Sequence, residues 1–301
     1  MNSFKLFFLG LFLCVTTLTN ADNSENTGAL LWKISGNGLE KPSYVLGTFH
    51  LASKTMLDSI PGAYAALNDC EQIVGELVMS EAKAQTQKML QAAMMPTDTT
   101  YQILYTEEEY KKVDEGVKSF LGVGFEQLGI LKPGMISTTI SVLMYQKFFP
   151  EINMNETMDN YVQEYALSAQ KTILGLETFD EQMDVLFNST SLKYQAEQLL
   201  CLFESQEYVH HYMVKIIEAY NNKDLAAIQL LFEEEDNAPC ASSKGEEDTL
   251  LKNRNDNWIK KLPAIMQEKG SFIAVGAGHL VGNYGLLTQL RALGYAVEPV
   301  K

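Results

Sequence analysis

The stretch of sequence that decides the fold is Ser271 to Leu280, which reads SFIAVGAGHL. It starts as an apolar, strand-forming run, and Gly276 marks the point where the chain leaves that strand. The same plan occurs near the other end of the chain, where Ser43 to Leu51 reads SYVLGTFHL. In both copies an apolar strand is followed by Gly-x-x-His-Leu, with the histidines at His50 and His279. This repetition predicts a domain built from pseudo-twofold halves.

A second pair of strands ends in carboxylates. Ile73 to Glu76 reads IVGE, and Ile173 to Glu177 reads ILGLE. Sites in α/β folds lie at the carboxyl ends of the strands, because side chains presented there stand on a rigid support. We therefore expect Glu76 to lie near the two strand-end histidines, and Glu177 to lie close by.

The remaining pattern predicts short strands at both ends of the chain and helices between them. Strands are expected at 30–34 and 295–298, and helices over 80–170, over 191–220 as one long helix, around Trp258 and over 284–293. Thr106 with Glu109, and Thr178 with Glu181, have the spacing of capping boxes that begin helices. Strands that alternate with helices predict an α/β or α+β fold with a long helical middle segment.

The charge balance excludes one class of partner. The 301 residues include 38 acidic and 23 basic side chains, for a formal charge of -15. Phosphate backbones repel so acidic a surface, so nucleic acid is not expected to bind. Apolar residues make up 46% of the chain, which is sufficient for a packed globular core.

The first 21 residues have the pattern of a secretory signal peptide. Lys5 precedes the apolar run Leu6 to Val15, and the small residues before position 22 predict cleavage after Ala21. A bilayer span needs ~20 apolar residues, so this run is too short, although a retained anchor is the alternative interpretation. We expect a single exported domain over 22–301, periplasmic or extracellular, with no stable membrane span after cleavage.

Export bears on the cysteines. Cys70, Cys201 and Cys240 remain after cleavage, and an oxidising compartment allows two of them to pair. Cys201 with Cys240 is the favoured pair, because both lie beside the same predicted helical hairpin. The alternative is that all three are small buried side chains.

Two imidazoles and one carboxylate are a ligand set typical of a divalent transition metal with open coordination positions. Such an ion lowers the pKa of bound water and polarises a carbonyl group. Glu177 is then a candidate general base or fourth ligand. A lone histidine at a strand end also occurs as a purely structural residue. His210 and His211 are adjacent on a predicted helix, about 100° apart, and are expected on its solvated face.

Several motifs occur in the order typical of one family. They are LGTFHL at 46–51, VGEL at 74–77, GLETFDEQ at 175–182, RNDNW at 254–258 and AVGAGHLVG at 274–282. On these motifs the chain resembles the TraB/GumN/PrgY family, which includes the Tiki metalloproteases, from about Leu30 to its end. The resemblance implies an erythromycin-esterase/ChaN-like fold of two small β-sheets related by a pseudo-twofold and wrapped by helices. It also implies that His50, His279 and Glu76 bind the metal.

These observations support a first hypothesis and two rivals. The first is an exported metal-dependent hydrolase that cleaves a peptide or protein and uses Mn²⁺, Co²⁺ or Zn²⁺. Glu177 and Arg254 would then support the ligands or bind substrate, with Arg254 able to hold a carboxylate or a developing oxyanion. The rivals are a non-catalytic protein that binds a peptide or a haem-like ligand, and a metal-free esterase that uses histidine and glutamate as acid and base. Nothing in the sequence indicates the oligomeric state.

Overall fold

The fold is α/β, as the sequence predicts. The computed structural model describes residues 28–150, 157–234, 239–241 and 243–301, so the expected signal peptide lies outside the described residues. The strands are β1 Leu31–Ser35, β2 Ser43–Thr48, β3 Gln72–Gly75, β4 Thr172–Gly175, β5 Ser271–Gly276 and β6 Ala296–Pro299.

The strands form one mixed, six-stranded sheet in the order β4-β3-β5-β2-β1-β6. The expectation of two small sheets is therefore corrected. The physical reason is that β5 pairs on one edge with β2 and on the other with β3, both in parallel, and so joins the two halves. The two Gly-x-x-His strands lie side by side, with Thr48 opposite Gly276. Strand β1 pairs antiparallel with both β2 and β6 and so runs opposite to the other described strands.

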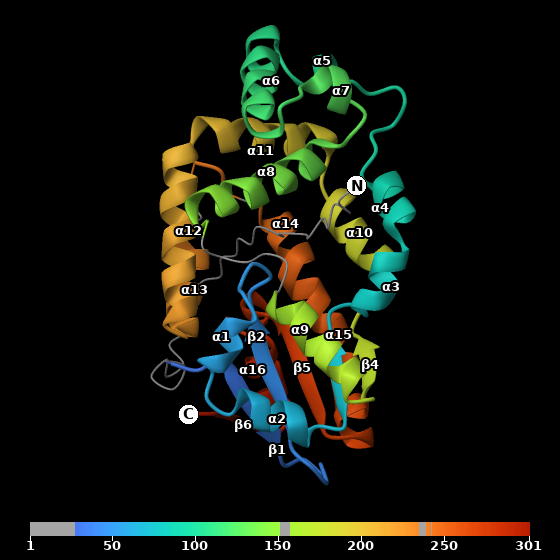
Figure 1. Ribbon diagram of the computed structural model, residues 1–301, viewed down its shortest axis with the longest axis vertical. Coiled ribbons are helices and arrows are strands. Elements are labelled where there is room, and N and C mark those ends of the chain that lie inside the picture. Colours follow the sequence, from blue (N-terminus) through green and yellow to red (C-terminus); the bar gives the residue numbers. More distant parts are fainter. Residues whose placement is uncertain (1–27, 151–156, 235–238, 242) are drawn as a thin grey trace.

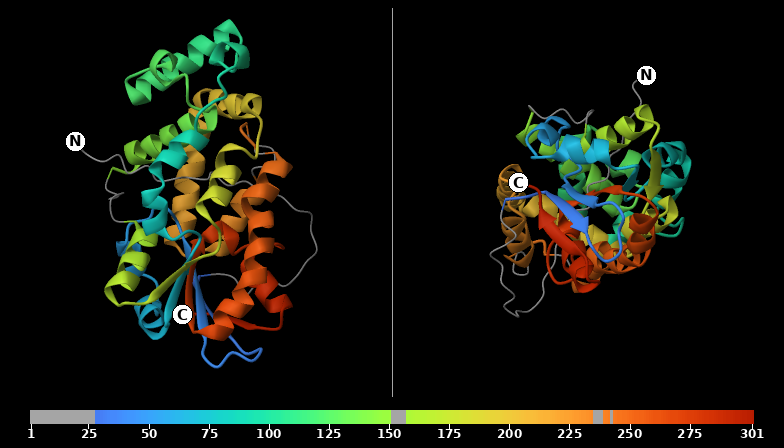
Figure 2. Two further views of the ribbon diagram at one scale, coloured as in Figure 1. Left: turned by 90° about the vertical axis from the view of Figure 1, so that its right-hand side faces the viewer. Right: turned by 90° about the horizontal axis from the view of Figure 1, so that it is seen from below.

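Helices cover both faces of the sheet and extend beyond one end of it (Figure 1). They are α1 Thr55–Asp58, α2 Ala63–Asp69, α3 Met79–Ala84, α4 Thr86–Ala92, α5 Tyr101–Leu104, α6 Glu107–Leu121, α7 Phe125–Leu128, α8 Pro133–Phe148, α9 Met158–Ser168, α10 Phe179–Phe187, α11 Leu192–Glu204, α12 Gln206–Asn221, α13 Leu225–Glu234, α14 Lys244–Glu247, α15 Asn253–Glu268 and α16 Leu286–Ala292. Helix α9 packs on β3 and β4, whereas α15 and α16 pack together on the opposite face (Figure 2).

The helical middle follows the sequence pattern with one exception. Helices α3 to α9 occupy the segment expected to be helical, and both predicted capping boxes are present, at Thr106 and Thr178. The long helix expected over 191–220 is instead two helices, α11 and α12. The helix is interrupted at Ser205, whose φ of -119° and ψ of 32° are not helical. The Ser205 side chain makes no capping hydrogen bond to α12, while its backbone N–H donates to the carbonyl of Cys201 and ends α11. The apolar periodicity alone does not reveal this break.

Two principal cores underlie this architecture. The larger core surrounds the sheet, and every residue of β5 is buried. The smaller core lies among α5, α6, α8 and α11, around fully buried residues such as Val113 and Ile140. Cys201 and Cys240 form a disulfide, as predicted, while Cys70 is buried and free. Among the described helices, none combines the length and apolar character that crossing a bilayer requires.

Candidate active site

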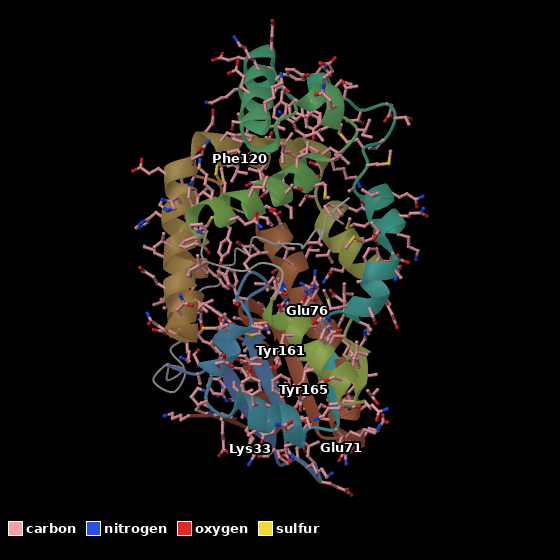
Figure 3. The ribbon with its side chains drawn as sticks, in the orientation of Figure 1. Lys33, Glu71, Glu76, Phe120, Tyr161 and Tyr165 are labelled. Atoms are coloured by element: carbon pink, nitrogen blue, oxygen red, sulfur yellow. A yellow bond between two sulfur atoms is a disulfide. The ribbon has the colours of Figure 1, made fainter. Side chains whose placement is uncertain are left out.

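The carboxyl ends of four parallel strands bring the predicted residues to one edge of the sheet. Glu177 follows β4, Glu76 follows β3, His279 follows β5 and His50 follows β2. Because these strands are neighbours in that order, side chains far apart in sequence become neighbours in space. Figure 3 shows Glu76 at this edge, where the sheet meets the overlying helices.

His50, Glu76 and His279 converge on a common region. The Nε2 atoms of His50 and His279 lie 4.0 Å and 3.9 Å from the same oxygen, Oε1 of Glu76. That oxygen also accepts a hydrogen bond of 2.9 Å from the backbone N–H of Gly276. His279 is fully buried and Glu76 nearly so, whereas the side chain of His50 is 24% exposed. A solute can therefore reach the cluster from the His50 side.

Asp159, on α9, orients His50. Its Oδ2 lies 3.2 Å from Nδ1 of His50, and its Oδ1 accepts a 2.7 Å hydrogen bond from Oγ1 of Thr48. A carboxylate at Nδ1 holds the proton there, so Nε2 turns toward Glu76. Burial lowers the pKa of His50, but the charge and hydrogen bond of Asp159, together with the charge of Glu76, outweigh it and raise the pKa to about 9.

Asn255, on α15, orients His279 in the equivalent way. Its Oδ1 lies 2.7 Å from Nδ1 of His279, while its amide donates to the backbone carbonyls of His279 and Tyr284. The amide orientation makes Nδ1–H the donor, which leaves the Nε2 lone pair facing Arg254, whose Nη1 lies 3.0 Å away. Burial and the adjacent guanidinium hold the pKa of His279 well below its ordinary value.

Arg254 is the charge centre of the cluster. It donates two hydrogen bonds to Glu177, of 2.7 Å and 3.0 Å, and one of 2.7 Å to Oε2 of Glu76. Its guanidinium carbon also lies 4.7 Å from the centre of the Trp258 ring. Only 7% of Arg254 is exposed, so both ion pairs lie in a region of low dielectric.

The two glutamates respond differently to this arginine. Burial raises the pKa of Glu76, but Arg254 and the two imidazoles outweigh it, and its pKa is lowered. Burial dominates for Glu177 and raises its pKa, although Arg254 opposes the shift. The structure places Glu177 behind Arg254, where Trp258 and Gln182 also donate to its oxygens. The hydrogen bonds to Glu177 therefore come from the arginine side of the cluster.

Gly276 keeps the space between the three residues open. A Cβ built at this position would lie 3.4 Å from Oε1 of Glu76 and 3.8 Å from Nε2 of His50. It would also lie 3.6 Å from a ring carbon of His279. Any side chain larger than a methyl group would therefore enter the space that the cluster surrounds.

The imidazole nitrogens and the carboxylate oxygen are donor atoms of the kind that a divalent transition metal binds. In this structure, however, these atoms are too far apart to coordinate one ion. Ligand atoms around a tetrahedral ion, with bonds of about 2.1 Å, lie about 3.4 Å apart. The separations here are 3.9 Å and 4.0 Å, so contraction by about half an ångström and withdrawal of Arg254 from His279 would be needed. Within the described residues, no group of three or more His, Cys, Asp or Glu side chains has metal-site geometry.

The other two histidines lie away from this cluster. His210 and His211 are exposed on α12, as the sequence predicts, and the His210 ring packs against Phe148. Asp159 was not identified from the sequence. It is 109 residues from His50 and follows no apolar strand, so no local pattern marks it. The role of Asn255 likewise could not be predicted from the sequence, because it depends on the packing of α15 behind β5.

Two strand-end histidines and a carboxylate, supported by a buried arginine, define a site with the components of acid–base or metal chemistry. The chain matches the TraB/PrgY/gumN family over residues 30–299, and it belongs to that family. It is also similar to the protein named "Metalloprotease TIKI homolog" from Nematostella vectensis, with 22% identity over 92% of this chain and 68% of the relative. No solved structure matches the chain. The family predicted from the motifs is thus confirmed.

Proposed function

We propose that the protein is an exported, metal-dependent hydrolase of peptide bonds. The observation that carries this proposal is the convergence of two Nε2 atoms on one carboxylate oxygen, at 3.9 Å and 4.0 Å. The similarity to a protein named as a metalloprotease supports the same class of reaction. The substrate is accordingly a peptide or protein.

His50, Glu76 and His279 would hold the ion, which we propose to be Mn²⁺, Co²⁺ or Zn²⁺. A divalent transition metal supplies Lewis acidity that activates water and polarises a carbonyl group. Asp159 and Asn255 hold the Nδ1 side of each imidazole, so that both Nε2 atoms are presented without a search among rotamers.

Arg254 is proposed to bind substrate and stabilise negative charge. In the present arrangement its Nη1 faces His279. Once withdrawn from that nitrogen, the guanidinium remains beside the cluster, where it can donate to a substrate carboxylate or a developing oxyanion. Glu177 fixes the plane of this guanidinium through two hydrogen bonds and is proposed to position it.

Export is proposed on two observations. The first 21 residues have the pattern of a signal peptide. The Cys201–Cys240 disulfide is of the kind that persists in oxidising compartments.

The test measures metal binding and peptide cleavage on the same purified protein. Mn²⁺, Co²⁺ and Zn²⁺ are titrated by calorimetry, and cleavage of a mixed peptide library is followed by mass spectrometry. We expect one ion per chain, and loss of both binding and cleavage in His50→Ala, Glu76→Gln and His279→Ala. His211→Ala is the matched control, because this histidine is exposed on α12 and should leave both measurements unchanged.

Unaltered cleavage in His50→Ala and His279→Ala would contradict the proposal. So would the absence of cleavage with every metal in a protein that is folded by circular dichroism. Saturable binding of a peptide or haem without turnover would then favour a non-catalytic binding protein.

A second candidate is a metal-free esterase, favoured by one specific contact. Arg254 Nη1 lies 3.0 Å from Nε2 of His279, at the lone pair that a metal would need. If this contact persists in the working protein, Arg254 and the imidazoles act on substrate directly. This candidate predicts ester hydrolysis that survives a chelator, whereas the metal-dependent hydrolase predicts its loss.

A further inference from the structure

An apolar pocket opens directly beside the cluster. It has a cavity volume of about 90 Å³, and His50 and Gly276 form part of its wall. The remaining wall comes mainly from α12 and α13, which lie together beside the end of β2 (Figure 1). Its apolar lining residues include Phe49, Leu51, Met213, Ile216, Ile228 and Phe232.

Three hydroxyl groups in the wall are turned toward other partners, while the wall also includes Tyr212 and the ring of His50. The hydroxyl of Tyr220 donates to the carbonyl of Gly47 at 3.0 Å, and that of Tyr145 donates to the carbonyl of Leu51 at 3.5 Å. Thr48 donates to Asp159. These hydrogen bonds leave mainly ring faces and carbon atoms toward the cavity. Burial of an apolar group against such a surface is favourable because it removes apolar area from water. A charged group would find few hydrogen-bonding partners there.

We propose that this pocket is the subsite for an aliphatic side chain of the substrate, next to the bond that is cleaved. The inference rests on the proposed function, because it takes the His50–Glu76–His279 cluster as the reaction centre. The shared wall at His50 and Gly276 places an occupant of the pocket beside that cluster. Leucine, valine and methionine are therefore the preferred residues at this substrate position.

The size of the pocket favours aliphatic over aromatic side chains. An apolar cavity of about 150 Å³ in another protein accommodates benzene. The cavity here is smaller, at about 90 Å³, and its walls are buried residues such as Ile228 and Phe232. A branched aliphatic group fits this volume, whereas a phenylalanine ring would require the walls to move.

The test separates binding from cleavage. The full chain, with ¹³C-labelled methyl groups, is titrated with N-acetyl-leucine amide, N-acetyl-phenylalanine amide and N-acetyl-aspartate amide. We expect the leucine compound to shift the methyl signals of Met213, Ile216 and Ile228 at the lowest concentration, and the aspartate compound to leave them unchanged. In parallel, peptides that differ only at this position are assayed for cleavage, with an expected preference of at least about tenfold for leucine over aspartate.

Two substitutions of opposite volume keep the test decisive. Ile216→Phe fills the pocket and should weaken binding of the leucine compound by about tenfold. Ile216→Ala enlarges the pocket and should shift preference toward the phenylalanine compound. Leu230→Phe is the control, because Leu230 is 56% exposed on α13 and does not line the pocket. Each variant is compared with the parent protein by circular dichroism before titration.

Equal shifts with the leucine and aspartate compounds would overturn the subsite, as would unchanged leucine binding in both folded Ile216 variants. Cleavage of peptides without preference at this position would also overturn the subsite while leaving the hydrolase intact. Selective binding of the leucine compound in a protein that cleaves nothing would support the pocket and contradict the hydrolase.

Discussion

Arg254 is the residue on which the candidate site depends most. It faces two buried carboxylates, from Glu76 and Glu177, and the lone-pair nitrogen of a neutral imidazole. The carboxylates lie too close together to remain ionised without a compensating cation. One guanidinium with its planar set of donors satisfies both, which an ammonium group would not do with the same geometry.

Removal of Arg254 is therefore expected to destabilise the fold. Arg254→Met leaves two buried carboxylates uncompensated, and losing one partner of a buried ion pair costs about 3–5 kcal/mol. Urea unfolding followed by circular dichroism measures this change. Lys252→Met is the control, because its pair with Asp256 is partly exposed and such pairs contribute about 0–1 kcal/mol. Equal losses of stability in the two variants would contradict this account.

Asp159 is expected to control the protonation of His50. Without that carboxylate, in Asp159→Asn, the pKa of His50 should fall from about 9 by about 1–3 units. The shift is measured by an NMR titration of the ring protons in protein without added metal, with His50→Gln used to assign the signal. Asp58→Asn is the control and should leave the titration unchanged, because the Asp58 carboxylate accepts a hydrogen bond from Tyr64 away from the site.

The sign of the associated stability change follows from the raised pKa. Protonated His50 stabilises the folded state below its ordinary pKa of 6.5, and this contribution is lost as the pH rises through about 9. In Asp159→Asn the pH range over which protonated His50 stabilises the folded state should narrow. A pKa that stays near 9 in the variant would show that Asp159 is not the cause.

At the scale of elements, the strand ends were predictable and their surroundings were not. Local sequence encodes an apolar run followed by Gly-x-x-His, so the positions of His50 and His279 follow from reading along the chain. The joining of all strands into one sheet depends on β5 pairing with both β2 and β3, which are non-local contacts. The positions of Asp159 and Asn255 depend on how α9 and α15 pack across opposite faces of that sheet. No local pattern records such packing.

The disulfide is a testable link between elements. Cys201 on α11 joins Cys240, which lies shortly before α14, across 39 residues. Burial raises the pKa of the Cys70 thiol to about 12, which keeps it protonated and unreactive. For residues 22–301 at pH 8, we expect no alkylation by iodoacetamide in the native state. One thiol should react in denaturant, and three should react after reduction, as counted by mass spectrometry.

A Cys70→Ser variant provides the control for that count, with no reactive thiol in denaturant before reduction. Reaction of three thiols in unreduced denaturant would show that Cys201 and Cys240 are not paired. Rapid labelling of the native protein would show that Cys70 is accessible.

At the scale of the whole molecule, the site lies where a sheet core ends and a helical layer begins. The sheet core and the helical core are separate clusters of buried side chains. A small cluster of Leu51, Tyr145 and Ile217 lies between the loop after β2 and helices α8 and α12. That loop also carries His50, so this cluster connects the helical layer to the candidate site.

Separate cores predict separate opening events, because cooperative units follow contiguous packing. Val113 on α6 and Val45 on β2 are both fully buried, one in each core. Either Val→Ala change should cost about 2 kcal/mol locally. We expect Val113→Ala to reduce hydrogen-exchange protection in α6, α8 and α11 while β5 keeps its protection. Val45→Ala should reduce protection in β5, and also in the helices if they require the sheet for their own stability.

If Val113→Ala lowered protection equally in α8 and β5, the molecule would open as one unit. The position of the site at a boundary between two cores would then have no consequence for its motion.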